Sequence, residues 1–183
     1  TCQLRSQKPC GHKTMMAGVL GHPERKVRIK TPNIGGGFGS KDGFYPDEAV
    51  TGFCEMQVER PVKWIETRSG SLQADDHGRG QVIDAEIAVD ENDELSAYRV
   101  QTTAGIGGDL GSKGCLAPST TFGLLLSGQY DLPAIHFDSQ GMYTNAVPTG
   151  VYRGVGRAEA ICTLERIMDI TARRLDIDPA EFR

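Results

Sequence analysis

The sequence has little that is continuously hydrophobic. Its apolar runs are short, such as the one at residues 123–126, whereas a helix needs about 20 apolar residues to cross a bilayer. No charged segment followed by an apolar core precedes that run, as a secretory leader would require. We therefore expect no membrane span. Because the chain opens at Thr1 without an initiator methionine, we also expect it to be an internal fragment, with part of the chemistry carried by residues outside it.

An excess of positive charge is also missing. The 183 residues contain 20 Lys and Arg against 24 Asp and Glu, a net charge of −4. Lys26, Arg28 and Lys30 follow one face of an expected strand, but three such charges are more often a solvated face. With no basic stripe to offset the negative balance, the sequence disfavours nucleic acid as a partner.

Paired cysteine motifs are absent. The five cysteines are an odd number, and none has C-x-x-C spacing. Cys10 lies close to His12 in the sequence, but no second pair completes a zinc site. This pattern favours reduced structural thiols in a cytoplasmic protein.

The usual nucleotide and hydrolase signatures are missing as well. The segment Gly39-Ser40-Lys41 lacks the G-x-x-x-x-G-K-[ST] order of a P-loop, and Ser40 occupies the last glycine position of G-x-G-x-x-G. Neither Ser40 nor Ser71 stands in a G-x-S-x-G context. The histidines are scattered singly, and we expect polar surface or capping positions for all of them: His12, His22, His77 and His136.

Glycine, by contrast, is abundant, with 23 residues. Residues 34–41 read Ile-Gly-Gly-Gly-Phe-Gly-Ser-Lys, directly after an expected strand. A backbone without Cβ atoms can adopt positive φ and point several N–H groups at one ligand. Two interpretations are equally favoured: a loop that holds a large polar cofactor, or a tight strand-to-helix connection without a ligand.

A second glycine-rich segment is Val-Tyr-Arg-Gly-Val-Gly-Arg at residues 151–157, immediately before an expected helix. Two arginines and two glycines at a helix N-terminus make a site suited to an anion. The alternative, that the arginines pair with surface carboxylates, is somewhat favoured when the segment is taken alone.

Hydrophobic periodicity predicts a mixed α+β fold. Helices are expected at residues 12–20 and 46–59 and from residue 157, with an apolar stripe of Ile161, Leu164, Ile167, Met168 and Leu175 and with Glu159 and Glu165 in solvent. A further helix is expected from Asp178, as N-cap, and Pro179. Strands are expected at residues 27–31, 62–65, 83–89, 95–103 and 135–143, and a glycine-rich loop at residues 105–114.

The order strand, glycine turn, helix, strand over residues 27–65 predicts a βαβ unit, whose turn lies where ligands bind in α/β sheets. We accordingly expect three parts: a βαβ-like part with the glycine turn (residues 1–76), a hairpin-rich β part (77–150), and a loop with helices (151–183).

Taken together, these segments resemble the molybdenum-binding large subunit of the xanthine dehydrogenase, aldehyde oxidase and aerobic carbon monoxide dehydrogenase family. The similarity covers nearly the whole chain in the family's order. The segments that carry it are residues 27–29, 32–41, 60–64, 66–69, 77–79, 144–145, 152–157 and 175–179. The resemblance implies a fragment of the molybdopterin-binding region, with mixed sheets and flanking helices.

The resemblance also implies a cofactor and site residues. In the family, molybdenum is held by the dithiolene of a molybdopterin, often as a cytosine dinucleotide, and not by protein side chains. Gly36, Gly37, Phe38 and Gly39 are implied to contact the pterin. Gln7 resembles a glutamine that hydrogen-bonds a molybdenum oxo group, although its flanking residues are less typical. Arg153, with Gly154, lies where the family places an arginine beside its active-site loop.

One departure bears on the substrate. Carbon monoxide dehydrogenases proper carry a copper-binding cysteine in a Tyr-Arg-Cys-Ser-Phe-Arg loop, whereas this chain has Gly154 there and its nearest cysteine, Cys162, inside the following helix. The loop therefore resembles form II members, which disfavours copper and favours an aldehyde or N-heterocycle over CO. The family's general-base glutamate is implied to lie outside this chain.

The implied enzyme oxidises its substrate with a water-derived oxygen and passes electrons to an iron–sulfur small subunit and a flavin (FAD) medium subunit, in a dimer of heterotrimers. Two alternatives remain: a non-catalytic binding or scaffold module that keeps the glycine turns only as structure and, within the enzyme class, an aerobic carbon monoxide dehydrogenase.

Overall fold

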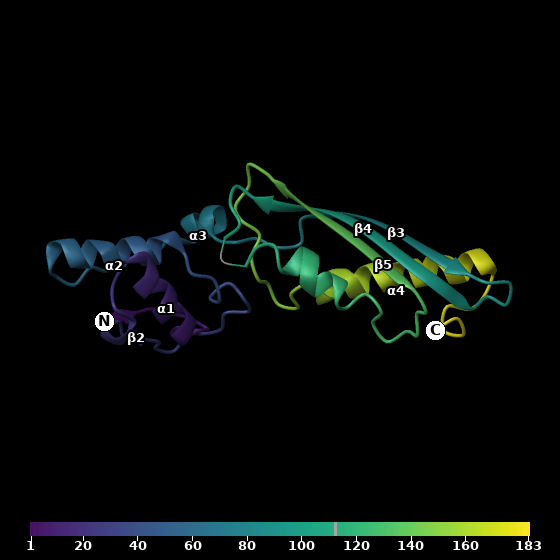
Figure 1. Cartoon of the computed structure of the whole chain (residues 1–183), viewed down its shortest axis with the longest axis horizontal. Coiled ribbons are helices and arrows are strands. Elements are labelled where there is room, and N and C mark those ends of the chain that lie inside the picture. The colour runs from purple at the N-terminus through teal and green to yellow at the C-terminus, as the bar shows by residue number, and fades with distance from the viewer. Residues whose placement is uncertain (112) are drawn as a thin grey trace.

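The computed structural model describes residues 1–111 and 113–183, which form an elongated body (Figure 1). Two small helices and a short sheet lie at one end, and a larger sheet with one long helix lies at the other. The elements are β1 (Cys2–Gln3), α1 (Pro9–Val19), η1 (Glu24–Lys26), β2 (Ile29–Lys30), α2 (Pro46–Val58), α3 (Arg68–Ala74), β3 (Gln81–Val89), β4 (Leu95–Gly107), η2 (Ala117–Thr121), β5 (Ile135–Tyr143) and α4 (Arg157–Leu175). We call β1, α1, β2 and α2 the helical end, and β3, β4, β5 and α4 the sheet end.

The helical end contains a strand–helix–strand unit, but not the expected one. β1 and β2 pair in parallel on either side of α1. The strand predicted at residues 62–65 is wrong, because this segment has no regular secondary structure and its Trp64 and Ile65 are exposed. The predicted strand at residues 27–31 is confirmed only at Ile29–Lys30.

Local sequence explains both helices of this end. Proline occupies the first turn of α1 and of α2, where no hydrogen bond from its nitrogen is needed. After α1, Gly21 adopts φ 60° and His22 N–H donates to Ala17 O at 2.9 Å, which closes a Schellman motif. The two helices approach closely because Gly52 of α2 has no side chain: a Cβ there would lie 3.0 Å from Met16 Sδ.

The sheet end is a three-stranded sheet in the order β3–β4–β5, with β3 antiparallel and β5 parallel to β4. These strands confirm the predictions at residues 83–89, 95–103 and 135–143. Helix α4 runs along one face of the sheet (Figure 1). Its Ala160, Leu164 and Met168 join the largest buried cluster, which also contains Tyr98, Val100, Phe122 and Leu126. Each large side chain buried there contributes about 1.5–3 kcal/mol.

Two further predictions differ from the structure, and one helix was not predicted. Ile161, expected in the stripe of α4, is exposed, since Ala160 takes the position that faces the sheet. The helix expected after Asp178 is only a turn, in which Asp178 Oδ1 accepts from Ala180 N–H at 2.8 Å. Helix α3 was not predicted, and its N-cap is Thr67, which accepts from Gly70 N–H at 3.0 Å. The loop expected at residues 105–114 includes residue 112, which lies outside the described residues.

The two ends are joined where the chain enters and leaves the larger sheet. Residue 77 precedes β3 and residue 149 follows β5, yet they form a parallel bridge. His77 N–H donates to Pro148 O at 3.0 Å, and Gly150 N–H donates to His77 O at 2.7 Å. Residues that follow 149 are thereby brought against the helical end. In the described parts of the chain, no helix is long and apolar enough to cross a membrane.

Candidate cofactor site

The first component of the site is the glycine loop, residues 34–41. Its backbone adopts positive φ at Gly35, Gly36, Phe38 and Gly39, with values of 65°, 93°, 53° and 107°. Lys41 closes the loop from within, because its Nζ donates to Ile34 O at 2.5 Å and to Gly36 O at 2.6 Å. A loop with this many left-handed residues persists only where its surroundings hold it.

Gln7 is one of the residues that hold it. Its Oε1 accepts from Gly39 N–H at 3.0 Å and from Lys41 N–H at 3.3 Å. A Cβ on Gly37 would lie 2.2 Å from this same oxygen. The side chain predicted to face a molybdenum oxo group thus also supports the glycine loop, and Gly37 must be a glycine to admit it.

The second component is the bend at residues 151–157. Gly154, Val155 and Gly156 adopt φ values of 103°, 40° and 79°. The turn is closed by Val155 N–H donating to Tyr152 O at 2.9 Å, and Arg157 N–H then donates to Gly154 O at 3.0 Å. Gly156 is the N-cap of α4, so the bend leads directly into the long helix.

The two components touch. A Cβ on Gly39 would lie 2.1 Å from Val151 O, so the loop and the bend approach backbone to backbone. The Arg153 guanidinium lies over the Phe38 ring, 5.8 Å from its centroid, a separation at which a cation is attracted to the ring face. The glycine-rich segments that looked unusual in the sequence therefore form one site.

A cavity of about 470 Å³ lies between them. Gln7, Phe38, Gly39 and Arg153 line it, together with Lys8, Asp42, Lys113, Leu116, Thr121, Val151 and Val155. Gly36, Gly37 and Phe38 line a second, more polar hollow of about 750 Å³ on the other side of the glycine loop, which Arg5 and Arg68 also border. Phe38 lines both hollows. Gly154 lies behind the bend, where a Cβ would be 3.6 Å from Arg79 Nη2.

The cavity wall between the glycine loop and the bend is positively charged. Lys8 Nζ lies 2.9 Å from Asp42 Oδ1, and Lys113 donates to Asp42 Oδ2. Burial alone would raise the pKa of Asp42, but hydrogen bonds from Lys113 and Lys8 outweigh it and hold that pKa below its usual value. With Arg153, the lining of the cavity contains three cations and one carboxylate, a balance that suits an anionic ligand.

His12 is a correction to the sequence analysis, which expected it at the surface. It is buried, and its Nε2 donates to Gly43 O at 2.8 Å, so that Nδ1 can accept from the Ser6 hydroxyl at 2.7 Å. His12 thereby ties the residues before Gln7 to those after the glycine loop. Its Nε2 also lies 3.3 Å from Glu48 Oε2. Burial raises the pKa of Glu48 to about 7, although His12 opposes the shift.

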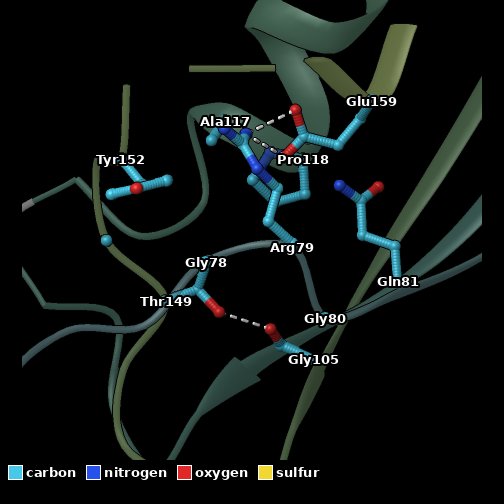
Figure 2. A pocket seen from close by; sticks show the side chains of 11 residues that line it. Gly78, Arg79, Gly80, Gln81, Gly105, Ala117, Pro118, Thr149, Tyr152 and Glu159 are labelled. Carbon is cyan, nitrogen blue, oxygen red and sulfur yellow. Dashed lines mark hydrogen bonds and ion pairs between the residues drawn. The ribbon is translucent and has the colours of Figure 1, made fainter. Parts of the chain in front are cut away.

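Glu159 is a second correction, because it was expected in solvent. It is only 9% exposed, and Arg79 Nη1 donates to its Oε1 and Oε2 at 2.9 and 2.8 Å. Figure 2 shows this pair above Gly78 and Gly80, with Tyr152 to one side. Its position in the sequence could have indicated this burial, because Glu159 is next to Ala160, the first buried residue of the apolar stripe of α4. Glu165, also expected in solvent, is partly buried, with its side chain 32% exposed, and pairs with Arg183.

Among the described residues, no three His, Cys, Asp or Glu side chains come together as a metal site. The thiols of Cys10, Cys115 and Cys162 are exposed, and those of Cys2 and Cys54 are partly buried. Cofactor binding at this site would therefore depend on backbone groups, amides and cations.

Comparisons with known proteins agree with this geometry. A family model described as "Molybdopterin cofactor-binding domain" matches residues 1–183. The carbon monoxide dehydrogenase large chain of Hydrogenophaga pseudoflava is 38% identical over 189 residues, covering 100% of this chain and 23% of that protein. Quinoline 2-oxidoreductase from Pseudomonas putida 86 superposes with a TM-score of 0.92 at 28% identity, over 99% of this chain and 23% of that one.

A Cu,Mo-CO dehydrogenase superposes with a TM-score of 0.91 at 30% identity, again over 99% of this chain and 23% of that one. The chain thus spans less than a quarter of the length of these three relatives. The predicted α+β fold and the resemblance to the molybdenum-binding large subunits are both confirmed.

Proposed function

This chain belongs to the family of molybdopterin cofactor-binding domains, and we propose that it forms one wall of the cofactor site of a molybdenum hydroxylase large subunit. The observation that carries the proposal is the backbone contact between the glycine loop and the bend, with a cationic cavity of about 470 Å³ beside it. That volume falls within the range typical of small-molecule sites.

The residues present fit a molybdopterin. A pterin offers amide-like donors and acceptors together with phosphate, which backbone groups in glycine turns can reach without a steric conflict. Gly36, Gly37, Phe38 and Gly39 would contact the ring, Arg153 would flank it and Gln7 would offer its side-chain amide. Gly154, behind the bend, would act only by shaping the turn that carries Arg153. When bound, the cofactor supplies the redox chemistry, and these residues orient it and shape access to it. The cationic wall with Lys8 and Lys113 supports the cytosine dinucleotide form, which has a second phosphate.

The proposed reaction is oxidation of a small aldehyde or N-heterocycle with oxygen from water. Copper is not proposed, because Gly154 offers no thiol and adopts φ 103°, a conformation that L side chains rarely take. The 38% identity to a carbon monoxide dehydrogenase large chain keeps CO as the alternative substrate. The general base is proposed to lie elsewhere in the subunit, since Glu159 is occupied by Arg79 and Glu165 by Arg183.

The proposed partners follow from the relatives named as large chains and large subunits. An iron–sulfur small subunit and a flavin medium subunit would receive the electrons, in a dimer of heterotrimers. We place this assembly in the cytoplasm, where the free thiols of the chain would stay reduced.

The test uses the full-length protein that contains this chain. We expect metal analysis to find molybdenum, and oxidation of the protein to release a fluorescent pterin product. A scaffold module would contain neither, and that result would overturn the enzymatic proposal. The loaded protein is then assayed with benzaldehyde, quinoline and CO. Turnover of benzaldehyde or quinoline without copper is expected, whereas CO turnover that requires copper would overturn the assignment based on Gly154.

A further inference from the structure

Arg79 links three parts of the chain. Its Nη1 donates to both oxygens of Glu159, in the first turn of α4. Its Nη2 donates to the carbonyl oxygen of Arg153 at 2.5 Å. Its guanidinium also lies 5.3 Å from the centroid of the Tyr152 ring. One side chain, just before β3, therefore holds both the bend and the helix that follows it; Figure 2 shows its pair with Glu159.

The backbone around this contact is strained, which shows that it is held. Arg79 itself has φ 74°, and Gly154, Val155 and Gly156 continue with 103°, 40° and 79°. A residue such as Arg or Val rarely adopts positive φ, and it does so only where tertiary contacts over-determine the conformation. The planar guanidinium of Arg79 provides such contacts, because its two terminal nitrogens bind Glu159 and Arg153 O at the same time.

The burial of Glu159 explains why residue 79 is an arginine. The Glu159 side chain is 8% exposed and that of Arg79 is 34% exposed. Nη1 of Arg79 donates to both carboxylate oxygens of Glu159, and Nη2 is left for Arg153 O. Glu159 also lies in the first turn of α4, where the helix dipole favours a negative charge. A lysine could neutralise this carboxylate, but its single ammonium could not also donate along a second planar arm to Arg153 O.

From this geometry we propose that Arg79 and Glu159 are positioning residues, which hold the Arg153 carbonyl so that the Arg153 side chain stays over Phe38 at the mouth of the cofactor cavity. The inference rests on the proposed function, since it assigns these residues a role toward that cavity. Arg79 acts through the backbone of Arg153 and lies behind the bend, away from the glycine loop. If the Arg153 carbonyl moved, the side chain of the same residue would move with it, and its guanidinium would leave its place over Phe38.

The experiment compares Arg79→Lys and Glu159→Gln in the full-length protein. In Arg79→Lys we expect hydrogen–deuterium exchange at residues 152–157 to rise roughly 10-fold, the scale for losing a charge-assisted hydrogen bond, while β3 and β5 exchange as in the wild type. Molybdenum content should stay near that of the wild type. The Mo(V) electron paramagnetic resonance spectrum, recorded after dithionite reduction, should shift.

Glu159→Gln keeps one acceptor oxygen for Nη1 and nearly the same shape. If the lysine variant fails to fold, the inference can still be tested with this variant. We expect a smaller rise in hydrogen–deuterium exchange at residues 152–157. Arg99→Lys and Glu86→Gln are matched controls, because this exposed pair on β3 and β4 also has a guanidinium at 2.6 Å from both carboxylate oxygens. The controls should leave exchange at the bend and the Mo(V) spectrum unchanged.

Two results would overturn the inference. One is an Arg79→Lys protein with wild-type exchange at the bend. The other is an increase spread evenly over the sheet and α4, which would mean that the pair serves general stability. A wild-type protein without molybdenum and pterin would instead refute the proposed function and the cofactor role with it, while exchange at the bend would still decide whether Arg79 positions it.

Discussion

At the residue scale, the glycines differ in what they permit. Gly37 leaves room for the Gln7 amide, and Gly39 leaves room for the Val151 carbonyl, whereas a Cβ on Gly18 would meet nothing within 4 Å. The sequence shows where glycine gathers, but not which neighbour each one admits. That depends on residues more than thirty positions away in the chain, such as Gln7 beside Gly39.

We predict that Gly39→Ala opens the site. Its Cβ would lie 2.1 Å from Val151 O, and φ 107° is rarely adopted by alanine, so the backbone must shift at a cost of about 1–3 kcal/mol or more. The measurement is the molybdenum and pterin content of the full-length protein, which should fall well below that of the wild type. Gly18→Ala, inside α1, is the control and should keep full content. Equal contents in the two variants would contradict the proposed contact.

Glu48 gives a prediction about pH. Its pKa in the folded protein is about 7, raised from an ordinary value of 4.5 by burial, so the folded protein binds more protons than the unfolded chain between these values. The contribution of Glu48 to stability therefore falls as the pH rises from about 4.5 to 7, and it is constant above that range. Glutamine mimics the protonated form, so Glu48→Gln should match the wild type near pH 5 and melt higher near pH 8.

The comparison is made by Tm, with His12 and Asp47 left intact because both influence Glu48. Glu59→Gln, at the exposed end of α2, is the control and should show no such divergence with pH. A Glu48→Gln protein that melts lower than the wild type at pH 8 would show that the carboxylate is ionised and favourable in the fold.

At this scale, the sequence indicated several residues that line the cavity, but it did not indicate which polar residues are buried. Gln7, Phe38, Gly39 and Arg153 were named in advance and line one cavity; their roles toward a cofactor stay predictions. His12 and Glu159 were expected in solvent and are buried. Both belong to pairs whose partners are distant in sequence, and a polar residue gives no sign of burial until its partner is known.

At the scale of elements, periodicity identified the long pieces and missed the short ones. The alternation in β3 and the stripe of α4 were visible because each extends over several repeats. β1 and β2 have two residues each, too few for any period. The run Val62 to Ile65 was expected to be a strand, but a segment this short does not determine its own structure. In the fold it is largely exposed. The division at residues 76 and 150 stays a prediction.

The end of α4 offers a stabilising substitution. Asp176 has φ 59°, and Ile177 N–H donates to Ala172 O at 2.9 Å, so the helix closes with a left-handed residue. Glycine adopts this conformation without the penalty of a Cβ. We predict that Asp176→Gly slows hydrogen exchange of the last turn of α4 by about 2- to 5-fold, corresponding to ~0.5–1 kcal/mol.

Asp176→Ala is the comparison for this prediction, because it removes the carboxylate but keeps the Cβ. It should exchange faster than the wild type. If glycine and alanine gave the same rate, the left-handed closure would not be what limits opening of that turn.

At the scale of the whole molecule, apolar surface is unevenly covered. The sheet end has the buried cluster around Phe122 and Leu164. At the helical end, Val50, Phe53, Met56 and Val58 of α2 are all exposed. The chain spans 23% of the carbon monoxide dehydrogenase large chain that it matches. This apolar surface is large for a unit that would exist alone.

We therefore predict that residues 1–183, produced by themselves, bind the dye ANS and self-associate at micromolar concentration, whereas the full-length protein binds much less dye per chain. The triple substitution V50Q/F53Q/M56Q should reduce both dye binding and association. Size-exclusion chromatography provides the second measurement. A monodisperse wild-type fragment that binds no dye would contradict the prediction that the exposed apolar side chains of α2 cause association.

The pairing of residues 77 and 149 has a kinetic consequence. Contacts that join distant residues must first close a long loop, and the entropy lost in closure delays them. Those made by Arg79 span 74 and 80 positions, while α1, α2, α4 and the β3–β4 hairpin need only near neighbours. A newly made chain should thus pass through a stage in which its helices and hairpin are formed, while the 77–149 bridge and the contacts of Arg79 are not yet made.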